Sequence, residues 1–347
     1  MEIAIMIITA AAIAAISIFV AIKLASKRIL SAALAYPHTP APVPAVEKGA
    51  DGLYPEPPAG PEMFYGTLDD QARAIIDRNR TELDRARRIW AETHQPEKTF
   101  ITAEDGCKLA GFIYLSDTPS NRWAVCVHGY RGSHDEMEAV AMHYCMHGFN
   151  ALAIDLRHHG ESEGDSVGLG WLDRRDAVLW CKMLVERFGS EIVIVMHGWS
   201  MGAATVMLAC TEEDVPAQVA GCIEDCGFSS YDAIVDTVAP TILGPLAKPV
   251  GAAAKSALRK SLNASSKTPT VAERISRCTV PVFFLHGDHD PLILPAVLDQ
   301  LAQACTVEGC RKWLVPNTGH CQAVVSHPSE YFERVLDFAD YAVASHR

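Results

Sequence analysis

The residues of this chain best suited to chemistry are a serine and its flanking glycines at positions 198–202, Gly-Trp-Ser-Met-Gly. Residues 192–197 are mostly β-branched or apolar with little polar alternation, which predicts a buried strand, and the small residues that follow predict a helix. A serine on a tight turn between strand and helix is typical of a nucleophile elbow. Ser200 acts as a nucleophile only if a histidine accepts its proton and backbone N–H groups hold the resulting oxyanion.

A second Gly-x-Ser-x-Gly pattern occupies residues 160–164, Gly-Glu-Ser-Glu-Gly. Polar residues precede it, and the following residues 165–168, Asp-Ser-Val-Gly, cannot open a helix. We therefore predict that Ser162 is a loop residue and that Ser200 is the nucleophile. The alternative, an incidental serine in a tight turn at position 200, is disfavoured by its flanking strand and helix.

Two later apolar segments, 280–285 and 312–315, each run into a polar loop that carries titratable groups. Open α/β sheets build their sites at the carboxyl ends of their strands, so these groups are candidates for one site. His320 is then the base, and Asp290 or Asp288 is the carboxylate that orients its imidazole. Asp290 is favoured because it lies deeper in the loop and precedes a proline, which stiffens the backbone.

A metal site in residues 286–290, His-Gly-Asp-His-Asp, is disfavoured. The cluster lacks the helical His-Glu-x-x-His spacing and the paired cysteines that define zinc geometries. We expect His286 and His289 to be hydrogen-bonded loop residues and His327, which precedes a proline, to cap the last helix. The expected chemistry requires no metal and no organic cofactor.

The strand predicted at 123–127 leads into a glycine-punctuated loop at 128–132, His-Gly-Tyr-Arg-Gly. With the N–H of Met201 as one oxyanion donor, the natural second donor is the N–H of Tyr130. The flanking glycines let this loop approach a reacting carbonyl group. The alternative is that the loop simply begins with a turn.

These motifs follow one another along residues 99–345, at 128–130, at 155–162 (Asp-Leu-Arg-His-His-Gly-Glu-Ser), at 198–202, at 286–290 and at 319–320 (Gly-His). In this order they resemble the serial motifs of the α/β-hydrolase fold family. Within that superfamily the chain is similar to bacterial membrane-anchored hydrolases of the Bem46-like and prolyl-oligopeptidase-like esterase groups.

The resemblance implies an α/β fold with a mostly parallel eight-stranded sheet, helices on both faces and a small cap insertion. It also implies the roles of the site residues: nucleophile Ser200, acid Asp290, base His320, and oxyanion donors Tyr130 and Met201. The family's pattern often has a smaller residue or a histidine beside the nucleophile, where this chain has a tryptophan. That departure bears on the shape of the pocket and leaves the reaction class intact.

A cap is predicted at about residues 227–276, because the stretch between the strand ending near Glu224 and that beginning at Val280 is too long for an ordinary loop. Tyr231 and other apolar residues of this insertion either line a site for a hydrophobic acyl group or bury the cap against the core. Trp199 and Tyr231 are the candidate substrate-binding residues.

Composition limits the function classes. At 347 residues and 49% hydrophobic content the chain can bury one large core. A net charge of -12 without a basic stripe argues against a nucleic-acid partner. The 11 cysteines include no Cys-x-x-Cys pair, which is typical of free thiols in a reducing compartment.

Residues 3–22 are uncharged and mostly aliphatic, long enough to span a hydrocarbon core of about 30 Å. We predict a single membrane-spanning anchor within residues 1–30. A cleaved signal peptide is disfavoured because no positive charge precedes the apolar run. Lys23, Lys27 and Arg28 follow it, which places the catalytic domain in the cytoplasm at the cell membrane by the positive-inside rule.

The region after the anchor is predicted to be a proline-rich spacer at 31–62, followed by the catalytic domain at 63–347. Residues 67–94 are expected to form an amphipathic helix that docks on this domain, with Ile75, Ile76, Leu83, Ala86 and Trp90 on its apolar side. Residues 98–115 are expected to form a hairpin that turns at 104–106.

Together these features predict a membrane-anchored serine hydrolase that cleaves carboxylic esters of small molecules through an acyl-enzyme on Ser200. A prolyl-oligopeptidase-type peptidase is less favoured because the chain has no extra length for a β-propeller. A lysophospholipase or thioesterase is an alternative because the anchor brings the site near lipid. A non-catalytic binding protein on a hydrolase scaffold is disfavoured, since a scaffold needs no complete set of nucleophile, base, acid and glycine loop.

Overall fold

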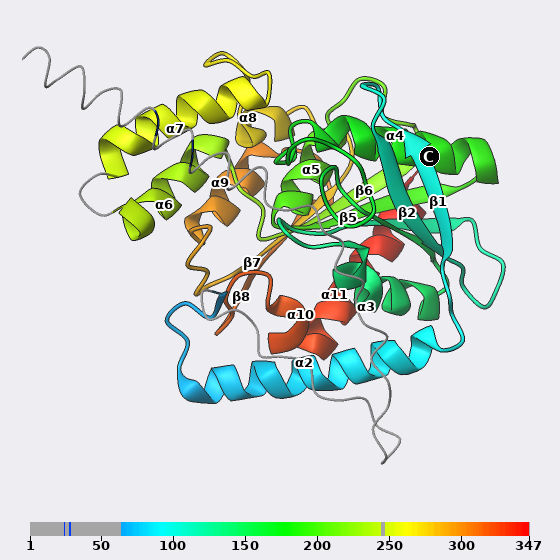
Figure 1. The fold of residues 1–347 in the computed structure, drawn as a ribbon. Helices are drawn as coiled ribbons and strands as arrows, with labels where there is room; N and C mark the ends of the chain where they lie inside the picture. Colours follow the sequence, from blue (N-terminus) through cyan, green and yellow to red (C-terminus); the bar gives the residue numbers. More distant parts are fainter. Residues whose placement is uncertain (1–23, 25–27, 29–63, 244–246, 347) are drawn as a thin grey trace, which may run out of the picture. The chain divides into compact units, whose positions relative to one another are not determined.

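The computed structural model describes residues 64–243 and 247–346, together with Leu24 and Arg28. These residues form an eight-stranded sheet of order β1-β2-β4-β3-β5-β6-β7-β8 (Figure 1). The pairs β1/β2 and β2/β4 are antiparallel and the remaining pairs are parallel, which confirms the expected mostly parallel sheet. The strands are β1 (Glu97–Thr102), β2 (Lys108–Tyr114), β3 (Arg122–Val127), β4 (Asn150–Ile154), β5 (Val193–Trp199), β6 (Val219–Asp225), β7 (Val282–Gly287) and β8 (Arg311–Val315).

Helices cover both faces of the sheet. Helices α3 and α11 pack on one face, with α2 and α10 outside them, and α4, α5 and α9 pack on the other, joined by α8 (Figure 1). Because both faces are covered, the central strands β3 to β7 are buried along almost their whole length, whereas the edge strands alternate. The helices are α2 (Asp70–Ala91), α3 (His134–Met146), α4 (Asp173–Phe188), α5 (Met201–Ala209), α8 (Val271–Ile275), α9 (Ala296–Ala304), α10 (Ala323–Ser326) and α11 (Pro328–Ser345).

The predicted hairpin is present as β1 and β2, which pair from Glu97 opposite Ile113 to Thr102 opposite Lys108. Its turn contains Gly106 at φ 91°, a conformation that residues with a Cβ rarely adopt. The sequence predicted the hairpin, and the structure places it at the antiparallel end of the sheet.

Helix α2 docks on the sheet domain through contacts with α3 and α10. Ile76 is buried, the side-chain amide of Asn79 donates to the carbonyl of Val325 at 2.8 Å, and Arg87 forms an ion pair with Glu138 on α3. The helix begins after Asp69, whose carboxylate accepts the N–H of Ala72 at 2.8 Å. The predicted amphipathic helix and its docking are thus both observed.

The prediction assigned too many residues to the buried side of α2. Ile75 and Ala86 are exposed, whereas Ile76 is buried and Leu83 and Trp90 pack partly against the core. The three contacting residues are spaced by seven and form one narrow stripe. At 100° per residue Ile75 and Ala86 lie well off that stripe, which is why they face solvent.

Residues Tyr231–Thr268 belong to a compact unit separate from the one that contains the sheet. Their helices α6 (Tyr231–Leu243) and α7 (Ala247–Ser261) pack against each other. Two ion pairs connect the helices, Asp236 with Lys255 at 2.6 Å and Asp232 with Arg259. A helical insertion therefore stands where the sequence predicted the cap.

Across the described part of the chain, we find no helix with the length and apolar character needed to cross a bilayer. The anchor predicted at 3–22 and the spacer predicted at 31–62 lie outside the described residues, so both stay predictions.

The docking of α2 can be tested with a matched pair of adjacent isoleucines. Ile76→Ala should lower the free energy of unfolding by about 2–5 kcal/mol, because it leaves a cavity where α2 meets the core. Ile75→Ala should change it by less than about 0.5 kcal/mol, since Ile75 is 37% exposed. Urea unfolding followed by circular dichroism measures both, and equal losses would show that α2 does not dock through this stripe.

Candidate active site

Ser200 lies at the junction of β5 and α5 with a backbone conformation of φ 51° and ψ -110°. Residues with a side chain rarely adopt this conformation, so the turn is strained. The two neighbouring glycines make it sterically feasible. A Cβ on Gly198 would lie 2.2 Å from the carbonyl oxygen of Gly202, and a Cβ on Gly202 would lie 2.1 Å from that of Val127. The turn is further fixed by the N–H of Ser200, which donates to the carbonyl of Asp225 at 2.8 Å.

Three predicted residues come together at the carboxyl ends of β5, β7 and β8. The Nε2 atom of His320 lies 2.8 Å from the hydroxyl of Ser200, and its Nδ1 atom lies 2.6 Å from Oδ2 of Asp290. The other carboxylate oxygen of Asp290 accepts the N–H groups of Leu292 and Ile293 at 2.8 and 2.9 Å. The carboxylate is therefore held by its own loop while it contacts the imidazole.

Asp288, the other candidate acid, makes different contacts. Its Oδ1 atom accepts the N–H of Thr318 at 3.1 Å and lies 2.6 Å from Nδ1 of His289. These bonds join the loop after β7 to the loop after β8, which carries His320. The structure therefore gives Asp288 a place in loop architecture and Asp290 the contact with His320.

The other histidines of these loops are hydrogen-bonded, as predicted. His286 is buried, and its Nε2 atom lies 2.9 Å from the carbonyl of Ile293 and 3.1 Å from Oδ2 of Asp290. His327 does occupy the residue before α11, but its side chain makes no capping hydrogen bond. Its Nδ1 atom instead lies 3.0 Å from the hydroxyl of Ser326, so the capping prediction was wrong for this side chain.

Burial and neighbouring charges shift the pKa values of both His320 and Asp290. Burial by itself lowers the pKa of His320, but the neighbouring Cys321 and the Asp290 carboxylate raise it, and the net pKa is well above its ordinary value. Burial raises the pKa of Asp290, but His320 and His286 lower it, and the net pKa is well below its usual range. The Asp290 carboxylate is therefore charged at neutral pH. Its charge stabilises the protonated form of the His320 imidazole, which is the form that the ring takes after it accepts a proton as a general base.

The segments that carry the two predicted oxyanion donors, Tyr130 and Met201, both adjoin Ser200, and the donor roles stay predictions. A Cβ on Gly129, the residue before Tyr130, would lie 3.5 Å from the Cβ of Ser200, so this loop contacts the nucleophile. The loop is shaped by the N–H of Arg131, which donates to Nε2 of His159 at 3.1 Å. Met201 is the first residue of α5, where an N–H group has no acceptor within its helix and the helix dipole favours negative charge.

The candidate substrate-binding residues have a less direct relation to the nucleophile. Trp199 is adjacent to Ser200, but its indole N–H donates to the hydroxyl of the buried Tyr331 on α11 at 3.0 Å. Tyr231 is the first residue of α6 in the cap unit. A substrate contact for either residue stays a prediction.

Ser162, the serine of the second motif, is buried in a loop as predicted. Its hydroxyl donates to the carbonyl of Asp155 at 2.7 Å and accepts the N–H of Ala110 at 2.8 Å. Both hydrogen bonds are to main-chain atoms, so the Ser162 side chain has a structural role: it connects its own loop to Ala110 of β2.

One contact on the catalytic loop was missed in the sequence. The carbonyl of Phe64 accepts the N–H of His320 at 3.1 Å, and the two rings lie 5.8 Å apart. Every residue type carries a carbonyl, so no sequence signal could have identified this partner. The segment that leads out of the proline-rich region therefore helps to hold the histidine.

Two groups of side chains could bind a metal ion within the described residues, and both include Cys226. In one group the ligand atoms of Cys226, His320 and Cys321 lie within 4.8 Å of one another, and in the other those of Cys226, His286 and Asp290 do. Residue spacing indicates only residues 286–290 as a possible metal cluster, because nothing in the sequence connects Cys226 to a loop far along the chain.

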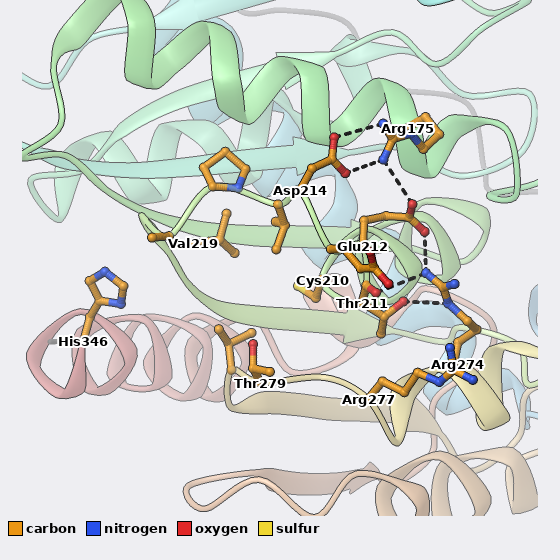
Figure 2. A pocket seen from close by; sticks show the side chains of 15 residues that line it. Arg175, Cys210, Thr211, Glu212, Asp214, Val219, Arg274, Arg277, Thr279 and His346 are labelled. Carbon is orange, nitrogen blue, oxygen red and sulfur yellow. Dashed lines mark hydrogen bonds and ion pairs between the residues drawn. The ribbon is translucent and has the colours of Figure 1, made fainter.

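A cavity of about 830 Å³ lies elsewhere in the domain, and its residues are drawn in Figure 2. It is lined by the segment 210–219 before β6, by residues near the start of β7 and by His346. Arg175 pairs there with Asp214 and Glu212. The cavity thus lies near the amino ends of β6 and β7, whereas Ser200, Asp290 and His320 follow carboxyl ends of strands, so it is separate from this site.

The fold and the site define a class: an α/β protein with a nucleophile elbow and a Ser–His–Asp hydrogen-bonded chain on a mostly parallel sheet. Residues 124–335, more than half of the chain, match the Alpha/beta hydrolase family, and the protein belongs to that family. The predicted superfamily is therefore confirmed. The finer assignment to the Bem46-like and prolyl-oligopeptidase-like groups stays a prediction.

Two curated relatives show how far the similarity extends. The chain is 25% identical over 276 residues to the uncharacterized protein YqkD of Bacillus subtilis, covering 75% of this chain and 85% of that protein. It is 31% identical over 150 residues to the multifunctional-autoprocessing repeats-in-toxin protein of Vibrio cholerae. That match covers 40% of this chain and only 3% of the toxin.

Solved structures with the same fold include esterases. The Pyrococcus furiosus esterase Pf2001 superposes with a TM-score of 0.59 at 21% identity, covering 72% of this chain and 92% of that chain. Est1E from Butyrivibrio proteoclasticus, with ferulic acid bound, superposes with a TM-score of 0.53 at 21% identity, covering 71% of this chain and 100% of that chain. At these identities the similarity establishes the fold.

The two aspartates of the loop after β7 provide a matched test of the acid. Asp290→Asn should lower turnover of a p-nitrophenyl ester by a factor of about 10⁴, because an amide cannot stabilise the imidazolium. Asp288→Asn should retain most of the turnover. Loss of the Asp290 charge should also lower the pKa of His320, which must be neutral to act as a base, so the acid limb of the residual kcat/KM profile should move to lower pH. A larger loss at Asp288, or an unmoved limb, would assign the acid elsewhere.

Proposed function

We propose that this protein is a membrane-anchored serine hydrolase that cleaves carboxylic esters of small molecules. The observation that carries the proposal is the hydrogen-bonded chain from Ser200 through His320 to Asp290, with contacts of 2.8 and 2.6 Å at a strained elbow. The two esterases of the same fold, Pf2001 and Est1E, support the reaction class. The substrate itself is left to experiment.

The geometry suggests a two-step reaction. The hydroxyl of Ser200 attacks the ester carbonyl while Nε2 of His320 takes its proton, and Asp290 stabilises the imidazolium. The N–H groups of Tyr130 and Met201 hold the oxyanion that forms. His320 then gives the proton to the departing alkoxide, and the alcohol leaves an acyl group on Ser200. A water molecule, deprotonated by His320, attacks this acyl group, and collapse of the second tetrahedral intermediate releases the carboxylic acid and restores the hydroxyl.

The two Gly-x-Ser-x-Gly motifs provide the test of the nucleophile. Ser200→Ala should abolish labelling by a fluorophosphonate, because the hydroxyl that would be phosphonylated is gone. Ser162→Ala should retain labelling of the folded protein, although leaving the N–H of Ala110 unpaired should cost about 1–3 kcal/mol of stability.

Labelling is measured per folded molecule, with circular dichroism as the check on folding. Labelling that persists in Ser200→Ala and disappears in folded Ser162→Ala would exchange the two roles. A panel of p-nitrophenyl esters of increasing acyl length, applied to the native protein, then separates a small-ester esterase from a lipid hydrolase.

We also propose that residues 3–22 anchor the enzyme in the cell membrane, with the catalytic domain on the cytoplasmic side. Full-length protein should remain with membranes after a high-salt wash, which removes electrostatic attachment only. A truncated protein starting at Met63 should be soluble and keep its turnover on a small ester, since it retains Phe64, whose carbonyl holds His320.

Release of the full-length protein by salt would contradict the anchor. Digestion of the catalytic domain by protease added to intact cells would contradict its orientation.

A further inference from the structure

Two thiols lie beside the imidazole of His320, and the proposed reaction uses neither of them. Cys226 directly follows β6 and Cys321 directly follows His320, so two strand ends bring the pair together. The N–H of Cys321 donates to Sγ of Cys226 at 3.3 Å. Both cysteines have left-handed backbones, with φ of 57° and 51°, so each is held at a tight turn rather than in a regular element.

The three side chains make a ligand set for a thiophilic cation. Both Sγ atoms and a ring nitrogen of His320 lie within 4.8 Å of one another. Zinc binds thiolate sulfur at about 2.3 Å and imidazole nitrogen at about 2.0 Å in a tetrahedron, so its ligand atoms lie less than about 4 Å apart. Small side-chain rotations close that difference, and water can occupy the fourth position.

A second feature of this corner is the buried acidic side chain of Asp225. Asp225, the residue before Cys226, has Cys226 and Tyr331 as its hydrogen-bonding neighbours. The group is fully buried and within electrostatic reach of Cys321 and His320. A dication bound by the adjacent thiols would lie near this buried acid, where negative charge is otherwise costly.

We propose that Cys226, Cys321 and His320 form a zinc site, and that the bound ion inhibits the enzyme. Zinc binds two thiolates and one neutral imidazole, so every proton that the two thiols and the imidazole carry beforehand is displaced to solvent. The inhibition rests on the proposed function, whereas the site itself does not.

Inhibition follows whichever ring nitrogen binds the ion. If Nε2 binds zinc, it can no longer take the proton of Ser200, which lies 2.8 Å away. If Nδ1 binds zinc, it loses its contact with Asp290 at 2.6 Å. The ion also has a route in, because Cys321 and Ser200 are both only half-buried.

The site is tested first without reference to activity, in full-length Ser200→Ala. With zinc chloride added, Cys321, the half-buried thiol of the site, should be protected from alkylation by iodoacetamide after brief exposure, as measured by peptide mass spectrometry. Cys107, a half-buried thiol in the β1–β2 hairpin, is the unprotected control. Resolution by residue is needed because Cys305 and Cys310, with sulfur atoms 3.4 Å apart, form another thiol pair that zinc could occupy.

The inhibition is then tested in otherwise native protein. Zinc should inhibit ester hydrolysis reversibly, with activity restored by a chelator. Cys226→Ser and Cys321→Ser should each raise the half-inhibitory zinc concentration by at least about 10-fold, as expected for loss of a ligand. Cys310→Ser, which breaks the other thiol pair, should leave that concentration unchanged.

The outcomes separate the two proposals. Protection of Cys321 in a protein that hydrolyses no ester would support the metal site while contradicting the proposed function. An unprotected Cys321, or equal zinc inhibition in the native protein and in both cysteine variants, would overturn the site whatever the activity.

Discussion

The left-handed backbone of Ser200 is the constraint on which the rest of the site depends. The sharp turn at Ser200 brings the end of β5 and the start of α5 very close together. Gly198 and Gly202 permit this close approach because neither has a Cβ atom. The turn lies on β5, which β3 flanks on one side and β6 on the other. The loop after β3 can therefore supply the proposed oxyanion donor, while β7 and β8 bring Asp290 and His320 from the opposite direction.

The other groups are held in place before any substrate arrives. Asp290 is fixed by two N–H groups of its own loop, and the loop of His320 is held by the carbonyl of Phe64. Such positioning matters in a site from which water is partly excluded. Hydrogen bonds stabilise a developing charge there best when their donors and acceptors are already in place before the reaction. The segment that links the predicted anchor to the domain thus also supports the catalytic loop.

The sequence predicted those features that depend on local pattern or on strand ends. Continuous apolar runs identified β3, β5 and β7 because helices cover both faces, and Ser200, Asp290 and His320 were found because open α/β sheets place their sites at carboxyl ends. Features set by tertiary contact were predicted less well. The exposure of Ile75 depends on which stripe of α2 meets the core, and the carbonyl of Phe64 carries no sequence signal at all.

The position of Cys226 beside His320 is likewise set by tertiary contacts that the sequence does not reveal, and it bears on function. The end of β6 supplies none of the three hydrogen-bonded groups Ser200, His320 and Asp290. The sheet order nevertheless places it between Ser200, which follows β5, and the loops after β7 and β8. The thiol of Cys226 therefore lies near the imidazole that the proposed reaction uses as a base. A neutral imidazole offers one lone pair, which either accepts a proton or binds a metal ion. Proton transfer and zinc binding at His320 are therefore mutually exclusive, and the geometry that assembles the base also exposes it to a competing ligand set.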